Sequence, residues 1–127
     1  MKKLDKLTYV SQAEQVIGKI SRNKRGEISL TTNKIRNMLT LINELYGMSK
    51  ADNEKVLNEE IQSRIQYTKM KLIYEAGRDV NVKDLLKCSD LLEYLDSIGN
   101  SKDSLMLVCK YMEALVAYHK FYAPKDN

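Results

Sequence analysis

Three side chains have the types that most often act as nucleophiles, general bases or metal ligands: Cys88, Cys109 and His119. A metal site in one chain usually needs three or four Cys, His or carboxylate ligands. These three residues form neither a CxxC nor an HxxxH pair, and His119 has no Ser or Cys near it in the sequence. The five glycines are isolated, and none belongs to a phosphate-cradling or nucleophile motif. The sequence therefore predicts no catalytic residue, no metal, no cofactor and no small-molecule substrate.

A second group of residues has the chemistry to bind nucleic acid. Its members follow one another at alternating steps of three and four residues: Arg64, Tyr67, Lys71, Tyr74 and Arg78. On a helix, where each residue turns by 100°, they lie within one sector of about 60°. Arg and Lys contact phosphates, and Tyr stacks on a base or donates a hydrogen bond to a phosphate. The alternative interpretation is a half-buried rim of tyrosines with the cations extended around it.

Helices must position these residues, because the chain is rich in Leu, Lys, Glu, Ile and Met and has one Pro. Apolar residues recur at helical spacing in five segments, near 6–20, 31–47, 53–77, 82–98 and 101–121. The segment Cys88–Asp90 would divide the fourth of these into two short helices. The predicted fold class is all-α, a compact bundle of five or six helices in a single domain.

Capping residues set the expected helix ends. A hydroxyl of Thr31 or Thr32 would begin the second helix and Gly47 would end it, and Asp52 or Asn53 would begin the third. Ser101 would cap the last helix, and Pro124 would stop it.

The last helix is apolar on nearly every side, which is typical of a helix at the centre of a bundle or shared with a partner. Glu113 is the one carboxylate along its apolar stretch, and if buried it would need a cation or Tyr from another helix. His119 near its end is interpreted as a cation that complements the helix dipole. The whole chain, 1–127, is expected to form one domain with flexible ends at about 1–6 and 123–127.

The charge is mildly basic and unevenly distributed. The chain has 21 Lys and Arg against 17 Asp and Glu, and residues 1–47 hold nine of the cations but four of the acids. This asymmetry favours an acidic partner, most often nucleic acid, although small soluble proteins often carry a few extra lysines. No apolar run approaches the roughly 20 residues of a membrane span, and no signal peptide is recognisable, so a cytoplasmic protein without membrane contact is expected.

Five segments together resemble a known family. The segment Leu30–Asn37 (LTTNKIRN) is similar to an LTTSKIRN signature, and Tyr67–Arg78 contains a YEAGR signature preceded by lysines. Val82–Asp84 and Ile98–Lys102 are similar to VKDF and IGDSK segments, and Tyr111–Tyr122 (YMEALVAYHKFY) resembles a C-terminal signature. The family is the small helical subunit of the type III-A CRISPR interference complex, the Csm complex. Asn33, Asn100 and Ala123–Pro124 depart from its usual Ser, Asp and Gly-Gly.

The resemblance implies a non-catalytic subunit in antiviral defence. Such subunits stack in several copies along a ribonucleoprotein, beside the backbone and large subunits. They contact the target RNA in its duplex with the CRISPR RNA. The expected partners are therefore CRISPR RNA, target RNA, the other subunits of the complex and further copies of the chain.

The resemblance and the residue patterns together select nine candidate RNA-binding residues. They are Thr32, Lys34, Arg36, Asn37, Arg64, Lys69, Lys71, Arg78 and Lys120. Contact with the RNA backbone is expected, because a subunit that serves any guide cannot read bases. Two alternatives remain: a protein–protein spacer without RNA contact, and a helical DNA-binding regulator. The connector Gly47–Asn53 is long for the tight turn of a helix-turn-helix.

Overall fold

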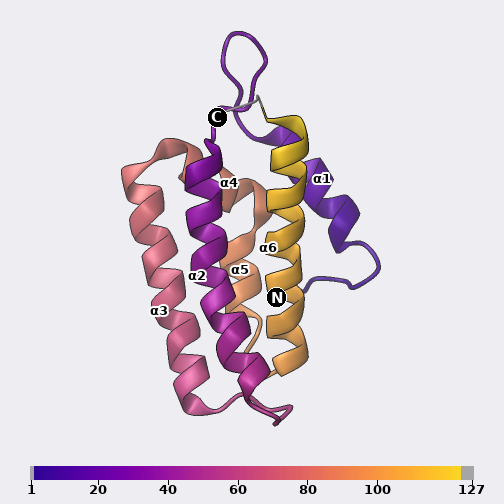
Figure 1. The fold of residues 1–127 in the computed structure, drawn as a ribbon, viewed down its shortest axis with the longest axis vertical. Coiled ribbons are helices and arrows are strands. Elements are labelled where there is room, and N and C mark those ends of the chain that lie inside the picture. Colours follow the sequence, from indigo (N-terminus) through magenta and orange to yellow (C-terminus); the bar gives the residue numbers. More distant parts are fainter. Residues whose placement is uncertain (1, 124–127) are drawn as a thin grey trace.

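The computed structural model describes residues 2–123, and this part of the chain folds into six helices (Figure 1). They are α1 Tyr9–Lys19, α2 Thr32–Ala51, α3 Glu59–Arg78, α4 Val80–Ser89, α5 Leu91–Asp96 and α6 Lys102–Tyr122. Within residues 2–123 the only β structure consists of two isolated bridges, Arg22 with Ile28 and Val56 with Ser101. The predicted all-α fold class is confirmed.

The three long helices α2, α3 and α6 lie side by side, with α2 between the other two in the view of Figure 1. The chain descends along α2, turns at residues 52–58 and returns along α3, so these two helices are antiparallel. Helix α1 packs against α6 and α4, and α4 and α5 fill the space behind the front layer. Helix α6 contacts α1, α2 and α5 and is the centre of the bundle, as its apolar sequence predicts.

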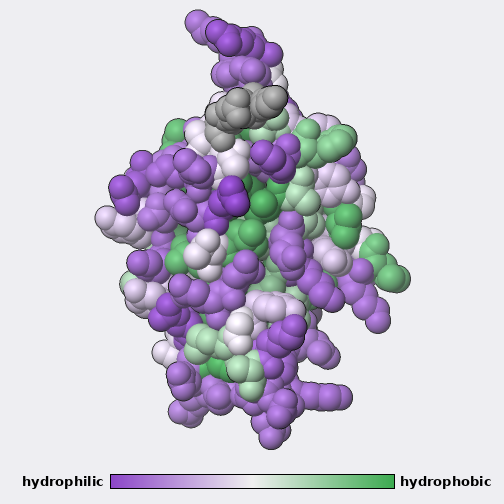
Figure 2. Space-filling model, in the orientation of Figure 1, coloured by the Kyte–Doolittle hydropathy of each residue, from purple (hydrophilic) through white to green (hydrophobic). Residues whose placement is uncertain are grey.

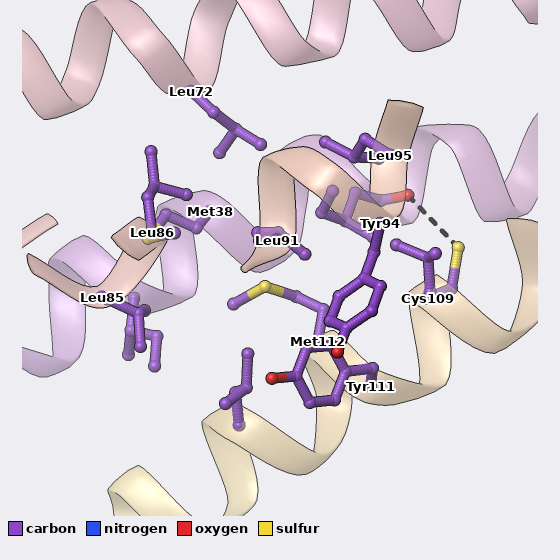
Figure 3. Packing of buried hydrophobic residues seen from close by; sticks show 14 of the residues in the cluster. Met38, Leu72, Leu85, Leu86, Leu91, Tyr94, Leu95, Cys109, Tyr111 and Met112 are labelled. Carbon is purple, nitrogen blue, oxygen red and sulfur yellow. Dashed lines mark hydrogen bonds between the residues drawn. The ribbon is translucent and has the colours of Figure 1, made fainter. Parts of the chain in front are cut away.

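The core is built mainly on α6. Its buried side chains, from Leu105 through Tyr111 and Met112 to Leu115, meet leucines of α3, α4 and α5 (Figure 3). Each fully buried large apolar side chain contributes about 1.5–3 kcal/mol. Cys109 is buried here as well and lies 3.8 Å from the carbonyl oxygen of Ile42 on α2 (Figure 3). Cys109 is thus a core residue, as predicted, whereas Cys88 is only partly buried.

The break between α4 and α5 occurs where the sequence predicts it. Asp90 adopts a left-handed conformation with φ 56°, which ends α4. The Ser89 hydroxyl accepts a hydrogen bond from the Leu91 amide at 3.2 Å, and the Tyr111 hydroxyl donates one to the Ser89 carbonyl at 2.9 Å. The buried Tyr111 therefore fixes the break from the neighbouring helix.

Two predicted helix ends are wrong. Helix α2 does not end at Gly47 but continues to Ala51, because Ser49 is buried against the bundle and extends the packed face by a turn. Helix α3 begins at Glu59, because Asn58 caps it by accepting a hydrogen bond from the Ile61 amide at 2.9 Å. The capping predictions for Thr31 and Ser101 are confirmed.

Residues 21–29 form a short hairpin that projects from one end of the bundle (Figure 1). The Asn23 amide donates to the Glu27 carbonyl at 2.8 Å, and Gly26 supplies the positive φ of 79° that the turn needs. The Ser21 amide donates to the Asp84 carboxylate of α4 at 2.7 Å, which anchors the base.

The structure changes what was expected of Glu113 and of the N-terminal end. Glu113 lies on the exposed side of α6, so it needs no buried partner. In the N-terminal end that was expected to be flexible, Lys2 pairs with Asp90 at 2.7 Å and Leu4 packs against the core. Met1, Pro124 and the rest of 124–127 lie outside the described residues.

Candidate nucleic-acid interface

The five residues selected by spacing do share one face of α3, and we call them the α3 ladder: Arg64, Tyr67, Lys71, Tyr74 and Arg78. The guanidinium of Arg64 lies 4.7 Å from the ring centroid of Tyr67, and the Lys71 ammonium lies 5.7 Å from the same centroid. The guanidinium of Arg78 lies 5.5 Å from the Tyr74 centroid. Tyr67 and Tyr74 are 42% and 60% exposed. These contacts hold the cationic groups along an accessible strip.

The cations of the ladder keep most of their charge available. Arg64 pairs with Glu44 of α2, and Arg78 lies 3.7 Å from Glu75 on its own helix. Both are surface pairs, which contribute about 0–1 kcal/mol and exchange readily for another anion. Lys71 has no acidic partner among residues 2–123. A phosphate would thus compete with weak pairs only.

Two candidates on α2 lie beside the ladder. Asn37 and Glu44 are seven residues apart, so they share a face of α2, and Glu44 meets Arg64 of α3. Because α2 and α3 are antiparallel, the register set by this pair brings Asn37 level with Lys71 and Lys34 level with Tyr74. The ladder and this side of α2 therefore form one surface, which we call the α2–α3 face.

Three other candidates gather at a separate pocket. Thr32 and Arg36 at the start of α2 and Lys120 near the end of α6 line a pocket of about 260 Å³. Ile35, Val116 and His119 complete its lining. The sequence separates Thr32 from Lys120 by most of the chain, and the antiparallel packing of α2 and α6 brings them together.

Lys69 lies apart from both groups. Its ammonium pairs with the carboxylate of Asp96 on α5 at 2.7 Å. Five residues after Arg64, it is turned by about 140° around α3 and joins α3 to α5. The nine candidates thus fall into three places: the α2–α3 face, the pocket beside α6, and the α3–α5 junction.

The candidate list omits the tip of the 21–29 hairpin. Lys24 and Arg25 are exposed there and have no acidic partner among residues 2–123. Arg22 instead stays at the base, where it donates to the carbonyls of Gly26 and Ile17 at 3.3 and 3.2 Å. The hairpin forms the hydrophilic projection of Figure 2. The cluster of cations at residues 22–25 is the sequence signal that could have identified the hairpin tip as a candidate.

His119 is held in the structure rather than presented to solvent. It is 1% exposed, and its Nε2 lies 2.7 Å from the Leu30 carbonyl oxygen, to which a neutral ring donates. Burial lowers the pKa of His119, and Lys120 lowers it further. The interpretation of His119 as a charged partner of the helix dipole is therefore wrong. Burial also raises the pKa of the Cys109 thiol to about 12, which keeps it protonated.

Residues 2–123 contain no group of three or more His, Cys, Asp or Glu side chains arranged to hold a metal ion. No helix in this range is both long and apolar enough to cross a membrane.

Fold and site together define a small all-helical protein whose accessible chemistry consists of cations and tyrosines on the bundle surface. Comparison with known proteins identifies the family of this chain. The chain belongs to the Csm2 type III-A family, whose model matches residues 4–125. The resemblance found in its sequence segments is thereby confirmed.

Two relatives illustrate the similarity. The CRISPR system Cms protein Csm2 of Streptococcus thermophilus is 41% identical over 118 residues, 93% of each chain. The protein of the same name from Mycobacterium tuberculosis (strain ATCC 25618 / H37Rv) is 37% identical over 119 residues, 94% of each chain.

Proposed function

We propose that the chain is the non-catalytic small subunit of a type III-A CRISPR ribonucleoprotein in the cytoplasm. In this role it stacks in several copies along the complex and binds the backbone of target RNA paired with CRISPR RNA. The family and its relatives support the place in a CRISPR system. The α2–α3 face supports the RNA contact.

The observation that carries the RNA contact is the pairing of each tyrosine of the α3 ladder with a cation. Arg64, Lys71 and Arg78 are seven residues apart, so they follow one another along α3 at intervals of about 10 Å. A row of cations at such intervals suits the repeated charge of a phosphodiester chain rather than one small anion. Such contact with the backbone would be independent of sequence, as any guide requires.

The chemically reactive side chains support a non-catalytic role. The Cys109 thiol and the His119 ring are buried, and each points to a backbone carbonyl of its own chain. Neither is available to act as a nucleophile or general base on a bound RNA. Cleavage of RNA would therefore belong to other subunits.

The test is the salt dependence of RNA binding. Arg64→Ala combined with Lys71→Ala should weaken binding to a guide–target duplex about tenfold or more at low salt. The slope of log K against log salt should fall by up to about two, because each lost phosphate contact removes about one unit at most. Titration of labelled RNA at several salt concentrations measures both quantities.

Lys69→Ala is the matched control. It removes one positive charge from the same helix, as each half of the double variant does, at a position paired with Asp96 away from the ladder. We expect little change in affinity or slope. If the double variant binds RNA as tightly as the original chain, with the same slope, the α2–α3 face is not the RNA surface and a protein–protein spacer becomes the better assignment.

Tighter binding of duplex DNA than of RNA would instead favour the DNA-binding regulator. The structure offers it little support, because residues 52–58 join α2 to α3. This connector exceeds the 3–4-residue turn of a helix-turn-helix.

A further inference from the structure

Helix α3 has a third face, directed neither at the core nor at the α2–α3 face. It borders a groove of about 540 Å³, whose apolar lining comes from α3, α4 and α5: Ile73, Ala76, Gly77, Leu86 and Leu92. The apolar surface continues beyond the groove, because Met70 and Val80 are also exposed. Exposed apolar strips of this kind mark interaction sites on soluble proteins. We call this feature the α3–α4 groove.

Gly77 lines this groove from the last turn of α3. A glycine inside a helix costs about 0.5–1 kcal/mol relative to alanine. Such a cost is usually offset where the backbone needs a positive φ or where another group approaches closely. Like Gly18 and Gly47, Gly77 has no positive φ, and a Cβ added to it would meet nothing within 4 Å in the described structure; of the three, Gly77 alone lines the groove. Its missing side chain keeps the floor of the groove open for a group from outside.

A complementary surface exists elsewhere on the same chain. Leu7, in the turn before α1, and Val10, in its first turn, are 85% and 45% exposed, and Phe121 and Tyr122 are 76% and 45% exposed at the end of α6. The Tyr122 hydroxyl donates to Glu14 of α1 at 2.7 Å, which ties the two pairs to adjoining parts of the surface. Figure 2 shows hydrophobic side chains projecting at the right-hand edge, over α1. We call these four residues the apolar knob.

The charges around the two surfaces allow one complementary pairing. The groove is bordered by two lysines and two carboxylates: Lys83 and Lys87 have no acidic partner among the described residues, Asp90 is paired with Lys2, and Glu93 completes the lining. Glu14 follows Val10 by one helical turn and so lies on the face of α1 that bears the knob. A knob seated in the groove would bring this carboxylate toward the two lysines.

We propose that the α3–α4 groove receives the apolar knob of a second copy of this chain. Helix α1 lies on the flank of the bundle opposite α3 (Figure 1), so the two surfaces face different neighbours. A contact between unlike surfaces repeats from copy to copy and leaves both ends open. This inference rests on the stacking of copies proposed above and supplies its contacts. It leaves the α2–α3 face uncovered for RNA.

The contact is expected to be weak between isolated copies. A stable interface buries about 1,600 Å² in total, and the knob consists of four partly exposed side chains. A ribonucleoprotein that holds copies next to one another raises their effective concentration, which makes a weak contact sufficient.

The test uses two variants that each remove one half of the contact. Gly77→Leu fills the groove, and Leu7→Ser combined with Val10→Ser removes half of the knob. In the original chain, methyl signals of Ile73 and Leu86 should shift with protein concentration up to the millimolar range. Each variant alone should lose this dependence, with association at least tenfold weaker. The Gly77→Leu variant keeps its knob, and the Leu7→Ser/Val10→Ser variant keeps its groove. Their equimolar mixture should therefore form a dimer, which cannot add a further copy at either end.

Gly47→Leu is the matched control, since Gly47 is also a helical glycine with no neighbour within 4 Å and does not line the groove. It should associate like the original chain. The proposal is overturned if the original chain shows no concentration dependence, if Gly47→Leu abolishes it equally, or if the mixture stays monomeric. RNA affinity should stay unchanged in all these variants, so this contact and the proposed RNA surface can fail independently.

Discussion

His119 is the single histidine of the chain, and its environment favours the neutral ring. It links the end of α6 to the carbonyl of Leu30, immediately before the cap of α2. The sequence could not reveal this, because the position of His119 in the last turn is equally compatible with an exposed, charged ring. Burial depends on which segment packs over it, and that segment lies 89 residues away.

This burial predicts a pH dependence of stability. The unfolded chain takes up a proton near the ordinary histidine pKa of about 6.5, whereas the folded chain resists protonation because its pKa is lowered. The free energy of unfolding should therefore fall as the pH falls below about 6.5, and this contribution should level off below the folded-state pKa. Urea denaturation between neutral and mildly acidic pH measures it.

His119→Gln keeps a hydrogen-bond donor but does not titrate. It should show a smaller fall in stability over the same pH range, whatever its stability at neutral pH. Identical pH slopes for the variant and the original chain would contradict the neutral, buried state of His119.

The ladder shows what helical spacing predicts well at the level of single residues. The period of 3.6 residues alone placed Arg64, Tyr67 and Lys71 on one face, and the ring contacts confirm that grouping. Spacing does not say which neighbour each face meets. Lys69 does not belong to this spacing and was selected through the resemblance of the segment Tyr67–Arg78; it faces α5 and pairs with Asp96.

Among the elements, the connector between α2 and α3 departs most from its prediction. Asp52 was a candidate cap, but its carboxylate accepts from the Glu54 amide at 3.0 Å within the connector. The Leu57 amide donates to the Asn100 carbonyl at 2.8 Å, which ties the connector to the start of α6. Tertiary contacts of this kind move a helix end by several residues without any local signal, whereas long periodic helices follow directly from apolar spacing.

The cap at Asn58 gives a prediction at this scale. Asn58→Ala should lower the free energy of unfolding by about 1 kcal/mol, because the Ile61 amide loses its acceptor. Asn58→Ser should retain most of the stability, since Ser is an equally good cap and adds no negative charge beside Asp52. Chemical denaturation compares the two. Equal losses in both variants would show that the Asn58 amide group acts through its bond to Asp52 rather than as a cap.

For the whole molecule, the two ends of the bundle differ in charge. The end that carries the hairpin presents Lys24, Arg25 and Arg36, whereas the opposite end mixes Asp52 and Glu54 with Lys50 and Lys55. The sequence indicates the basic half through its first 47 residues. It does not indicate that folding returns Arg78 and Lys120 to the same end, since this depends on the directions of α3 and α6.

The hairpin is expected to guide RNA toward the α2–α3 face. Lys24→Ser combined with Arg25→Ser should lower the association rate constant several-fold at low salt and change the dissociation rate little, because exposed charges act mainly on encounter. Stopped-flow measurements with labelled duplex separate the two rates.

The opposite end provides the control for this prediction. Glu54→Gln should leave the association rate unchanged or raise it slightly. A change confined to the dissociation rate in the hairpin variant would mean that Lys24 and Arg25 contact bound RNA instead of guiding its approach.

Helix α3 illustrates a consequence for how sequences of this family can vary. One of its faces packs in the core, one carries the ladder and one borders the α3–α4 groove. Several exposed positions of α3 are therefore sensitive to replacement, in addition to the buried ones. In a saturation mutagenesis scored by antiviral protection, α3 should tolerate fewer substitutions than its buried positions alone would account for. Many of the variants that lose protection should still fold normally. The difference between tolerance measured by protein abundance and tolerance measured by antiviral protection should therefore be larger on α3 than on the other helices.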